Sequence, residues 1–199
     1  MFRKTMRTIV FATNNKQKLQ ELRAIAAKEW NILSLSEIDC HDDIPETATT
    51  LEGNAMIKAQ WVKERYGYDC FADDTGLEVT ALDMRPGVYS ARYAGNDCNS
   101  ERNIDRLLCE LADKTDRSAR FRTVIALIEG EERKEFEGIV EGHIATERHG
   151  DGGFGYDAVF VPIGESRTFA QMDADEKNAI SHRGRAVKKL IEYLKTTLW

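Results

Sequence analysis

The chain opens with apolar and polar positions that alternate between strand-like and helix-like spacing. A short apolar run at Thr8–Thr13 (TIVFAT) predicts a buried strand. Lys16–Ala27 places its apolar residues every three or four positions, which predicts a helix with one buried face. A second strand is expected at Asn31–Leu35 and a second helix at Leu51–Tyr66. The first third of the chain therefore has the pattern of strand–helix units.

The middle of the chain predicts more sheet with one further helix. Two short strands are expected at Cys70–Asp73 and Leu77–Leu82, separated by a turn. Ser100–Ala112 has the spacing of a helix, and the long strands Ala119–Glu129 and Arg133–Glu147 read as a hairpin around Glu129-Gly130-Glu131.

The last part of the chain holds a glycine-rich loop, a strand and a basic helix. The strand is expected at Ala158–Val161 and the helix at about Arg183–Leu198. Early strand–helix units followed by a long hairpin predict an α/β fold, a long mixed β-sheet flanked by helices. With 199 residues and no evident linker or repeat, residues 1–199 are expected to form a single domain.

Composition narrows the classes of function. The balance of 42% hydrophobic and 31% charged residues is that of a soluble globular protein. No apolar run approaches the roughly 18 residues of a membrane span, and the apolar patch Ile9–Ala12 is too short for a signal peptide. A formal net charge of −6 disfavours a nucleic-acid partner. Neither a membrane nor a nucleic acid is therefore expected as a partner.

The cysteines and the charge distribution add two expectations. Cys40, Cys70, Cys98 and Cys109 form no C-x-x-C pair, which favours reduced thiols and a cytoplasmic location. Residues 29–57 carry acids without Lys or Arg, and residues 176–199 are mainly basic. These runs fit either two solvated faces or an acidic wall for a metal and a basic wall for an anion.

The segment Thr13–Lys18 (TNNKQK) lies between the first strand and the first helix. Backbone N–H groups at a helix start, together with the helix dipole, favour a phosphate. Asn15 can cap this helix and Asn14 tolerates a left-handed backbone. Lys16 and Lys18 add positive charge. The same residues also fit plain helix capping with surface lysines.

The segment Ala72–Leu77 (ADDTGL) places two adjacent carboxylates at the end of an apolar strand. On a continuing strand, Asp73 and Asp74 would point to opposite faces. One of them could then face a cleft while the other supports the turn or reaches a metal indirectly. An exposed turn is the structural alternative, because Asp, Thr and Gly are all turn formers.

The segment Gly150–Asp157 (GDGGFGYD) matches G-x-G-x-x-G, but a predicted strand follows it where a dinucleotide-binding site needs a helix. We interpret it as a loop whose glycines let the backbone approach a ligand, with Phe154 or Tyr156 against a flat ring.

The segment Glu176–Arg185 contains the start of a helix with Ser, His and Arg, which offer hydrogen-bond donors to oxygen acceptors. Its adjacent Ser and His do not face one another on a helix and so do not form a hydrolase dyad.

Together and in this order, these segments resemble the inosine triphosphate pyrophosphatase family. The stretches that carry the resemblance run from Ile9 to Tyr193 and are TNNKQK, ETATTLEGNAMIKA, FADDTGLEV, PGVYSARYAG, GGFGYDAVF, FAQM and EKNAISHRGRA. The resemblance implies a homodimeric α/β enzyme with a nucleotide cleft between two lobes. It implies Mg²⁺-dependent hydrolysis of nonstandard purine nucleoside triphosphates (ITP, dITP, XTP) to the monophosphate and pyrophosphate.

The resemblance also implies roles for individual residues. Asp74 is the expected general base, with Asp73 and Lys18 as further catalytic residues, and the metal ligands are expected to be Asp74 and Glu46. The residues expected to bind substrate are Thr13, Asn14, Asn15, Lys16, Gln17, Lys18, Lys58, Thr75, Phe154, Gly155, Tyr156, Asp157, Lys177, His182 and Arg183.

Two segments depart from the family pattern. Asn14 stands where the family usually has Gly. Pro45 and Ala48 stand where a metal-binding Glu and its following Gly are expected, which leaves the adjacent Glu46 as the candidate ligand.

Two other functions stay open. One is a Maf-type pyrophosphatase for other modified or pyrimidine nucleotides, and the other is a nucleotide-binding protein without activity.

Overall fold

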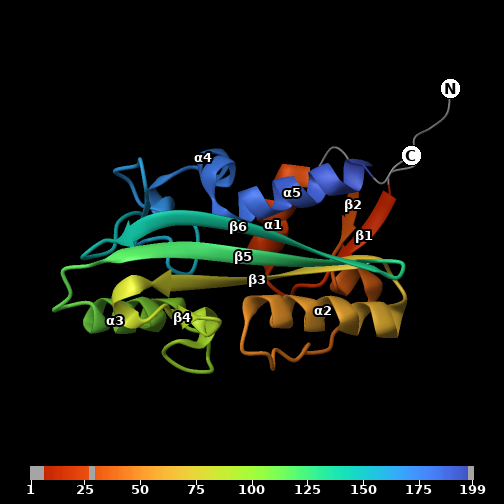
Figure 1. Cartoon of the computed structure of the whole chain (residues 1–199), viewed down its shortest axis with the longest axis horizontal. Helices are drawn as coiled ribbons and strands as arrows, with labels where there is room; N and C mark the ends of the chain where they lie inside the picture. Colours follow the sequence, from red (N-terminus) through yellow and green to blue (C-terminus); the bar gives the residue numbers. More distant parts are fainter. Residues whose placement is uncertain (1–6, 27–29, 197–199) are drawn as a thin grey trace. The chain divides into compact units, whose positions relative to one another are not determined.

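A computed structural model describes residues 7–26 and 30–196 of the chain (Figure 1). The strands are β1 (Arg7–Phe11), β2 (Trp30–Leu33), β3 (Cys70–Val79), β4 (Arg85–Gly87), β5 (Ser118–Glu129), β6 (Glu132–Ile144) and β7 (Phe160–Pro162). The helices are α1 (Lys16–Ala26), α2 (Leu51–Tyr66), α3 (Ser100–Glu110), α4 (Ala174–Ile180) and α5 (His182–Thr196). Short 3₁₀ turns lie at Ser36–Ile38, Thr80–Leu82, Ser90–Arg92 and Phe169–Gln171.

The strands form one mixed sheet in the order β2-β1-β3-β5-β6-β7, with β4 paired to β3. β1 runs parallel to β2 and to β3, and β4 and β7 run antiparallel to their neighbours β3 and β6. The hairpin turn between β5 and β6 passes through Gly130, whose φ of 59° is left-handed. The expected α/β fold with a long mixed sheet flanked by helices is confirmed.

The expected turn within Ala72–Leu77 is wrong, because Cys70–Val79 is one continuous strand. A Cβ on Gly76 would lie 2.7 Å from the carbonyl oxygen of Gly87, on the neighbouring strand β4. Gly76 is thus needed for the close approach of β4 rather than for a turn. The expected strand at Leu77–Leu82 ends at Val79 and continues as the 3₁₀ turn Thr80–Leu82.

Other boundaries shift by a few residues. β6 ends at Ile144 rather than at residue 147, and β7 starts at Phe160 rather than at residue 158. α3 ends at Glu110, two residues earlier than expected. The predicted ends of the first and last helices, at residues 27 and 198, lie outside the described residues. β4 and α4 were not predicted, because each is short and lacks a clear apolar period.

The chain divides into two compact units. The first holds the described residues of Met1–Asp74, Val124–Glu137 and Ala186–Trp199. Apolar residues cover both faces of β1 and β3: one apolar cluster packs these strands against α1 and α5, and another packs their alternate residues against α2 (Figure 1). Phe11 and Phe71 belong to the first cluster and stack with ring centroids 4.8 Å apart, whereas Val10 and Cys70 belong to the second.

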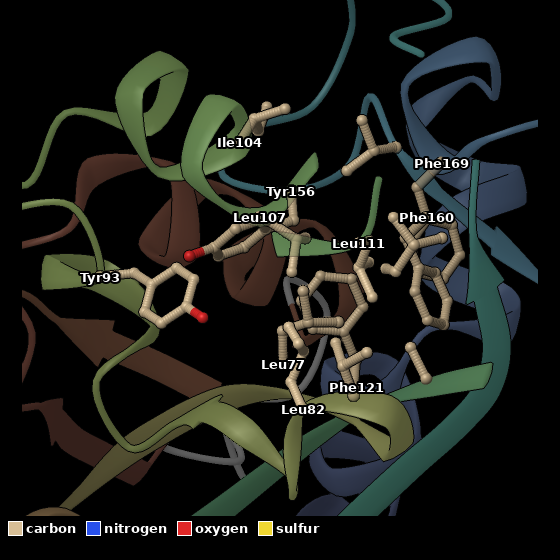
Figure 2. Close-up of a cluster of buried hydrophobic side chains, with 14 of the residues drawn as sticks. Leu77, Leu82, Tyr93, Ile104, Leu107, Leu111, Phe121, Tyr156, Phe160 and Phe169 are labelled. Carbon is tan, nitrogen blue, oxygen red and sulfur yellow. The ribbon is translucent and has the colours of Figure 1, made fainter. Parts of the chain in front are cut away.

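The second unit consists of Thr75–Thr123 and Gly138–Arg185 and has its own core. Figure 2 shows this core, in which Leu77 of β3 and Leu107 of α3 pack with the aromatic residues Phe121, Tyr156 and Phe160. The single domain and the nucleotide cleft stay predictions. In the part of the chain that the structure describes, no helix is both long and apolar enough to cross a membrane.

Candidate functional site

Asp73 and Asp74 are both buried on β3, with 1% and 8% of their surface exposed. Because side chains alternate along a strand, the two carboxylates point to opposite faces, as the sequence predicts if the strand continues. Asp73 accepts a hydrogen bond of 3.0 Å from the Lys18 ammonium, on the face that α1 covers. Asp74 faces α2 instead. The two carboxylates therefore have different partners and different chemistry.

Asp74 lies in a cluster of polar side chains from α2 and the loop before it. Asn54 donates from Nδ2 to Asp74 Oδ2 at 3.2 Å, and Lys58 Nζ lies 3.5 Å from Asp74 Oδ1. Asn54 and Lys58 are four residues apart and so share one face of α2. The Lys58 ammonium also donates to Glu46 Oε1 at 2.7 Å. The structure thus brings Asp74, Lys58 and Glu46 together.

The electrostatics of this cluster are strongly coupled. Burial raises the pKa of Asp74, and this effect outweighs the lowering by the Lys58 and Lys18 charges. Burial alone would lower the pKa of Lys58, but the negative charges of Asp74, Glu46 and Asp73 raise it above its ordinary value. A carboxylate with a raised pKa beside a fixed cation is an arrangement typical of catalytic sites.

The donor set for a cation is small. Among residues 7–26 and 30–196, no group of three or more His, Cys, Asp or Glu side chains is placed to hold a metal ion. Asp74 and Glu46 share Lys58 as a partner and provide two carboxylates. Two carboxylates suit a hard cation that takes its remaining oxygen ligands from a bound phosphate and water.

The segment Thr13–Lys18 links β1 to α1, as predicted. Asn15 caps α1: its Oδ1 accepts from the backbone N–H groups of Gln17 and Lys18 at 3.0 and 3.1 Å. Asn14 and Lys16 are exposed. Asn14 does not use the left-handed backbone that asparagine tolerates, since its φ is not positive. Its replacement of the family's Gly is therefore compatible with ordinary backbone geometry here.

In the second unit, Asp157 and Lys177 form a buried ion pair, with Lys177 Nζ 2.7 Å from Asp157 Oδ2. The same carboxylate oxygen accepts from the backbone N–H of Phe154 at 2.7 Å. Lys177 Nζ lies 4.8 Å from the centroid of the half-buried Phe154 ring, and Arg183 Cζ lies 5.4 Å from it. Phe154, Asp157, Lys177 and Arg183 therefore form one cluster.

His182 and Arg183 begin α5, and both are buried. Ser181 precedes them and accepts from the backbone N–H of Gly184 at 3.1 Å, which caps the helix. A Cβ on Gly184 would lie 2.0 Å from the carbonyl oxygen of Asn178 in α4. The close approach of α4 to α5, which sets where His182 and Arg183 stand, thus requires glycine at this position.

The glycine-rich loop differs from its expected form. Gly150 and Gly152 lie against Ala170 of a neighbouring 3₁₀ turn, where a Cβ on either would come within 2.6 to 2.8 Å of its backbone. These glycines therefore serve internal packing rather than close approach to a ligand. Tyr156 is buried in the core (Figure 2). Its hydroxyl donates to the carbonyl of Ser90 at 2.8 Å. Phe154, not Tyr156, is then the aromatic side chain available to a flat ring.

Three buried residues at these two clusters were not predicted. Asn54 holds Asp74 and also accepts from the backbone N–H of Ala48 at 2.9 Å. Phe121 stacks on the ring of His182, with centroids 4.5 Å apart and planes 18° apart. Thr123 lies beside Thr75. An asparagine one helical turn before Lys58 in the predicted helix was a signal that the sequence offered, whereas Phe121 and Thr123 resemble ordinary strand residues.

Comparisons with known proteins find similar sequences and structures over nearly the whole chain. The model of the Ham1 family matches residues 9–193. A protein of Flavobacterium psychrophilum named dITP/XTP pyrophosphatase is 54% identical over 94% of this chain and 98% of its own length. A protein of the same name from Porphyromonas gingivalis is 54% identical over 95% of this chain and 98% of its own length. The solved structure of a HAM1 protein from Coxiella burnetii has a TM-score of 0.88 and 41% identity, with 96% of this chain and 100% of that chain covered. The structure of the Staphylococcus aureus Ham1 protein has a TM-score of 0.87 and is 39% identical in sequence. The match covers 96% of this chain and 99% of that chain.

Proposed function

Because the chain belongs to the Ham1 family, we propose that it hydrolyses the nonstandard purine nucleoside triphosphates ITP, dITP and XTP to the monophosphate and pyrophosphate. The observation that carries this proposal is the identity of 54% to a dITP/XTP pyrophosphatase across nearly all of both chains. The cluster of buried Asp74 and Lys58 with the more exposed Glu46 supports it, because it has the charges that phosphate hydrolysis needs.

In the proposed reaction, water is added across the anhydride bond between the α- and β-phosphates, and pyrophosphate leaves. Asp74 orients the water and accepts its proton, for which the raised pKa of this carboxyl is favourable. Lys18 and Lys58 offset the negative charge of the phosphate oxygens. Asp73 holds the Lys18 ammonium in place. Thr13, Asn14, Asn15, Lys16 and Gln17 contribute backbone and side-chain donors to the triphosphate.

Mg²⁺ is the proposed cofactor, and Asp74 and Glu46 are the residues that would hold it. When bound, the ion supplies further positive charge against the phosphate oxygens. Two protein carboxylates match the usual habit of Mg²⁺, which keeps several waters and takes phosphate ligands from the substrate. Lys58 bridges the same two carboxylates and fixes their orientation.

The second cluster is proposed to bind the base. Phe154 offers a ring face for stacking, and Lys177, His182 and Arg183 offer donors to the carbonyl oxygen at purine position 6. Adenine carries an amino group at that position, so the same donors would be left without an acceptor and ATP would be disfavoured. Asp157 holds Lys177 through the buried ion pair, and Thr75 and Gly155 complete the proposed set.

We further propose that the enzyme acts as a homodimer in the cytoplasm, without a nucleic-acid or membrane partner. The location is supported by the cysteines, because Cys40, Cys70, Cys98 and Cys109 are all free, as expected where thiols stay reduced. The acidic net charge of −6 supports the absence of a nucleic-acid partner. Sedimentation of the purified chain tests the dimer, for which a monomer mass of 22.6 kDa is the contrary result.

Pyrophosphate release from a nucleotide panel, with and without Mg²⁺, tests the function. We expect release from ITP, dITP and XTP, little from ATP, and none once the metal is chelated. Faster release from modified pyrimidine nucleotides would favour a Maf-type enzyme. Binding of ITP without any release would leave a nucleotide-binding protein.

Replacing Lys18 with methionine is expected to raise KM or lower kcat for every triphosphate alike. Its ammonium pairs with Asp73 and is proposed to meet phosphates, which all the nucleotides share. The ratio of kcat/KM for ITP to that for GTP should therefore stay within about threefold of wild type, less than about 1 kcal/mol. Steady-state kinetics with both substrates measure this. A large change in the ratio would place Lys18 at the base instead.

A further inference from the structure

In the second unit, the hydroxyl groups of Thr75 and Thr123 form a hydrogen-bonded pair next to Arg183. Arg183 donates from Nη2 to Thr75 Oγ1 at 3.3 Å, and Thr75 Oγ1 lies 2.7 Å from Thr123 Oγ1. Arg183 is 2% exposed and Thr123 is fully buried. Three side chains from α5, β3 and β5 are thus joined in series, the outer two buried and Thr75 half-buried.

The burial of Thr123 sets the direction of these hydrogen bonds. Within residues 7–26 and 30–196, Thr75 Oγ1 is the one hydrogen-bond partner of the Thr123 hydroxyl. A buried O–H that donates to nothing is costly, whereas an unused lone pair costs less. Thr123 therefore donates to Thr75, and Thr75 Oγ1 accepts from Thr123 and Arg183 at once. Thr123 of β5 thus helps to fix the position of one N–H group of the Arg183 guanidinium through Thr75.

The neighbouring residue on the same face of β5 has a parallel contact. Phe121 and Thr123 are two positions apart on the strand, so their side chains point to the same face. Phe121 stacks on His182, and Thr123 reaches Arg183 through Thr75. Successive residues of this face thus support successive residues at the start of α5.

We propose that Thr123 is a positioning residue for base recognition, which acts through Thr75 to fix the Arg183 guanidinium and so sets the preference for purines with an oxygen at position 6. The inference rests on the proposed function and assigns a role to a residue that contacts no substrate. Its physical basis is that a charged donor loses alignment once the hydroxyl behind it is removed.

The test compares kcat/KM for ITP and ATP in the full-length wild type and in Thr123→Val, which replaces the hydroxyl with a methyl group. The preference for ITP should fall about tenfold, in the range expected for one hydrogen bond to a charged group. The loss should appear as a higher KM for ITP with kcat little changed, because the base contact is made before and during the reaction. Thr123→Ser keeps the hydroxyl and should retain the preference within about twofold.

Two further variants separate positioning from loss of stability. Ile125→Val removes one methylene from a fully buried side chain of β5. It should lower the melting temperature and leave the preference unchanged. If Thr123→Val does not fold, Thr123→Ala is compared with Thr123→Ser, because these two differ by one oxygen. The preference should then fall in Thr123→Ala alone.

The outcomes for the two proposals are distinct. A wild-type preference for ITP that both Thr123→Val and Thr123→Ala retain would overturn the role of Thr123 and leave the proposed function standing. An equal loss in Thr123→Ser and Thr123→Ala would also overturn it, since the hydroxyl would then not matter. A wild type without any preference for ITP over ATP overturns the proposed function and this inference with it.

Discussion

Replacing Asp74 with asparagine is expected to lower kcat for ITP by about 10²–10⁴-fold, the usual contribution of a general base. The amide has nearly the same shape as the carboxyl but neither its charge nor its basicity. Asn54 and Lys58 surround Asp74, and Lys58 keeps Glu46 as a partner in the variant. Burial already raises the pKa of Asp74, so removal of its charge should cost little stability. The melting temperature should therefore stay close to that of the wild type.

Glu78→Gln is the matched control, because it makes the same chemical change on the same strand. Glu78 pairs with Arg120 Nε at 2.6 Å and belongs to neither proposed cluster. Turnover of ITP by this control should match the wild type, measured as initial rates of pyrophosphate release. An Asp74→Asn enzyme that keeps more than about a third of wild-type turnover would contradict the role of Asp74 as base.

The helix that the sequence predicted best, α2, has a capping residue at its start and a glycine at its end. α2 begins and ends where expected, because Thr50 caps its first turn by accepting from the Gly53 N–H at 3.1 Å. Gly67, with a left-handed φ of 74°, then ends the helix. Between these residues the buried side chains recur at helical spacing. The capping residues and the apolar spacing both predict a helix over this segment, and the tertiary contacts do not change that prediction.

β3 shows where local chemistry misleads. Asp73, Asp74, Thr75 and Gly76 are all turn formers, and the sequence alone favours a break there. The strand continues because pairing partners hold it: Leu77 lies opposite Gly87 of β4 in an antiparallel register. Gly76 admits that strand at close range. Gly87 lies eleven residues after Gly76, so the residues around Asp73–Gly76 do not reveal this contact.

The candidate site was predictable only in part for the same reason. The alternation of side chains along a strand correctly puts Asp73 and Asp74 on opposite faces. Which helix covers each face is a property of the sheet order, so the pattern could not pair Asp73 with Lys18 or Asp74 with Lys58. The resemblance to a family supplied those residues as a set, without their contacts.

Tyr156 shows how the backbone path of a loop decides which side chain is buried. Glycine neighbours made an exposed loop with an aromatic side chain for a ligand the natural interpretation. The structure buries Tyr156 to 4% exposure, among the aromatic residues of the second core (Figure 2). Two positions earlier, Phe154 stays half-buried beside Lys177 and Arg183. The backbone path of the loop decides which ring turns inward, and composition does not encode that path.

Replacing Arg183 with methionine is expected to reduce the discrimination between ITP and ATP roughly ten- to a hundredfold. Arg183 is 2% exposed and is held by Thr75. Methionine keeps an unbranched apolar stem and removes every donor. A donor lost from the oxygen at purine position 6 costs ITP about 1–3 kcal/mol and costs ATP little, because adenine offers no acceptor there. The measurement is kcat/KM for both substrates.

Arg185→Met provides the control for this change. Arg185 lies two residues further along α5, is exposed, and donates to the carbonyl of Ile139 at 2.7 Å. It therefore loses the same charge from the same helix turn without touching the proposed base cluster. Discrimination in Arg185→Met should equal that of the wild type. If Arg183→Met also discriminates like the wild type, the donors that read position 6 must be sought in Lys177 and His182, and the hydroxyl pair behind Arg183 would then serve the packing of α5 alone.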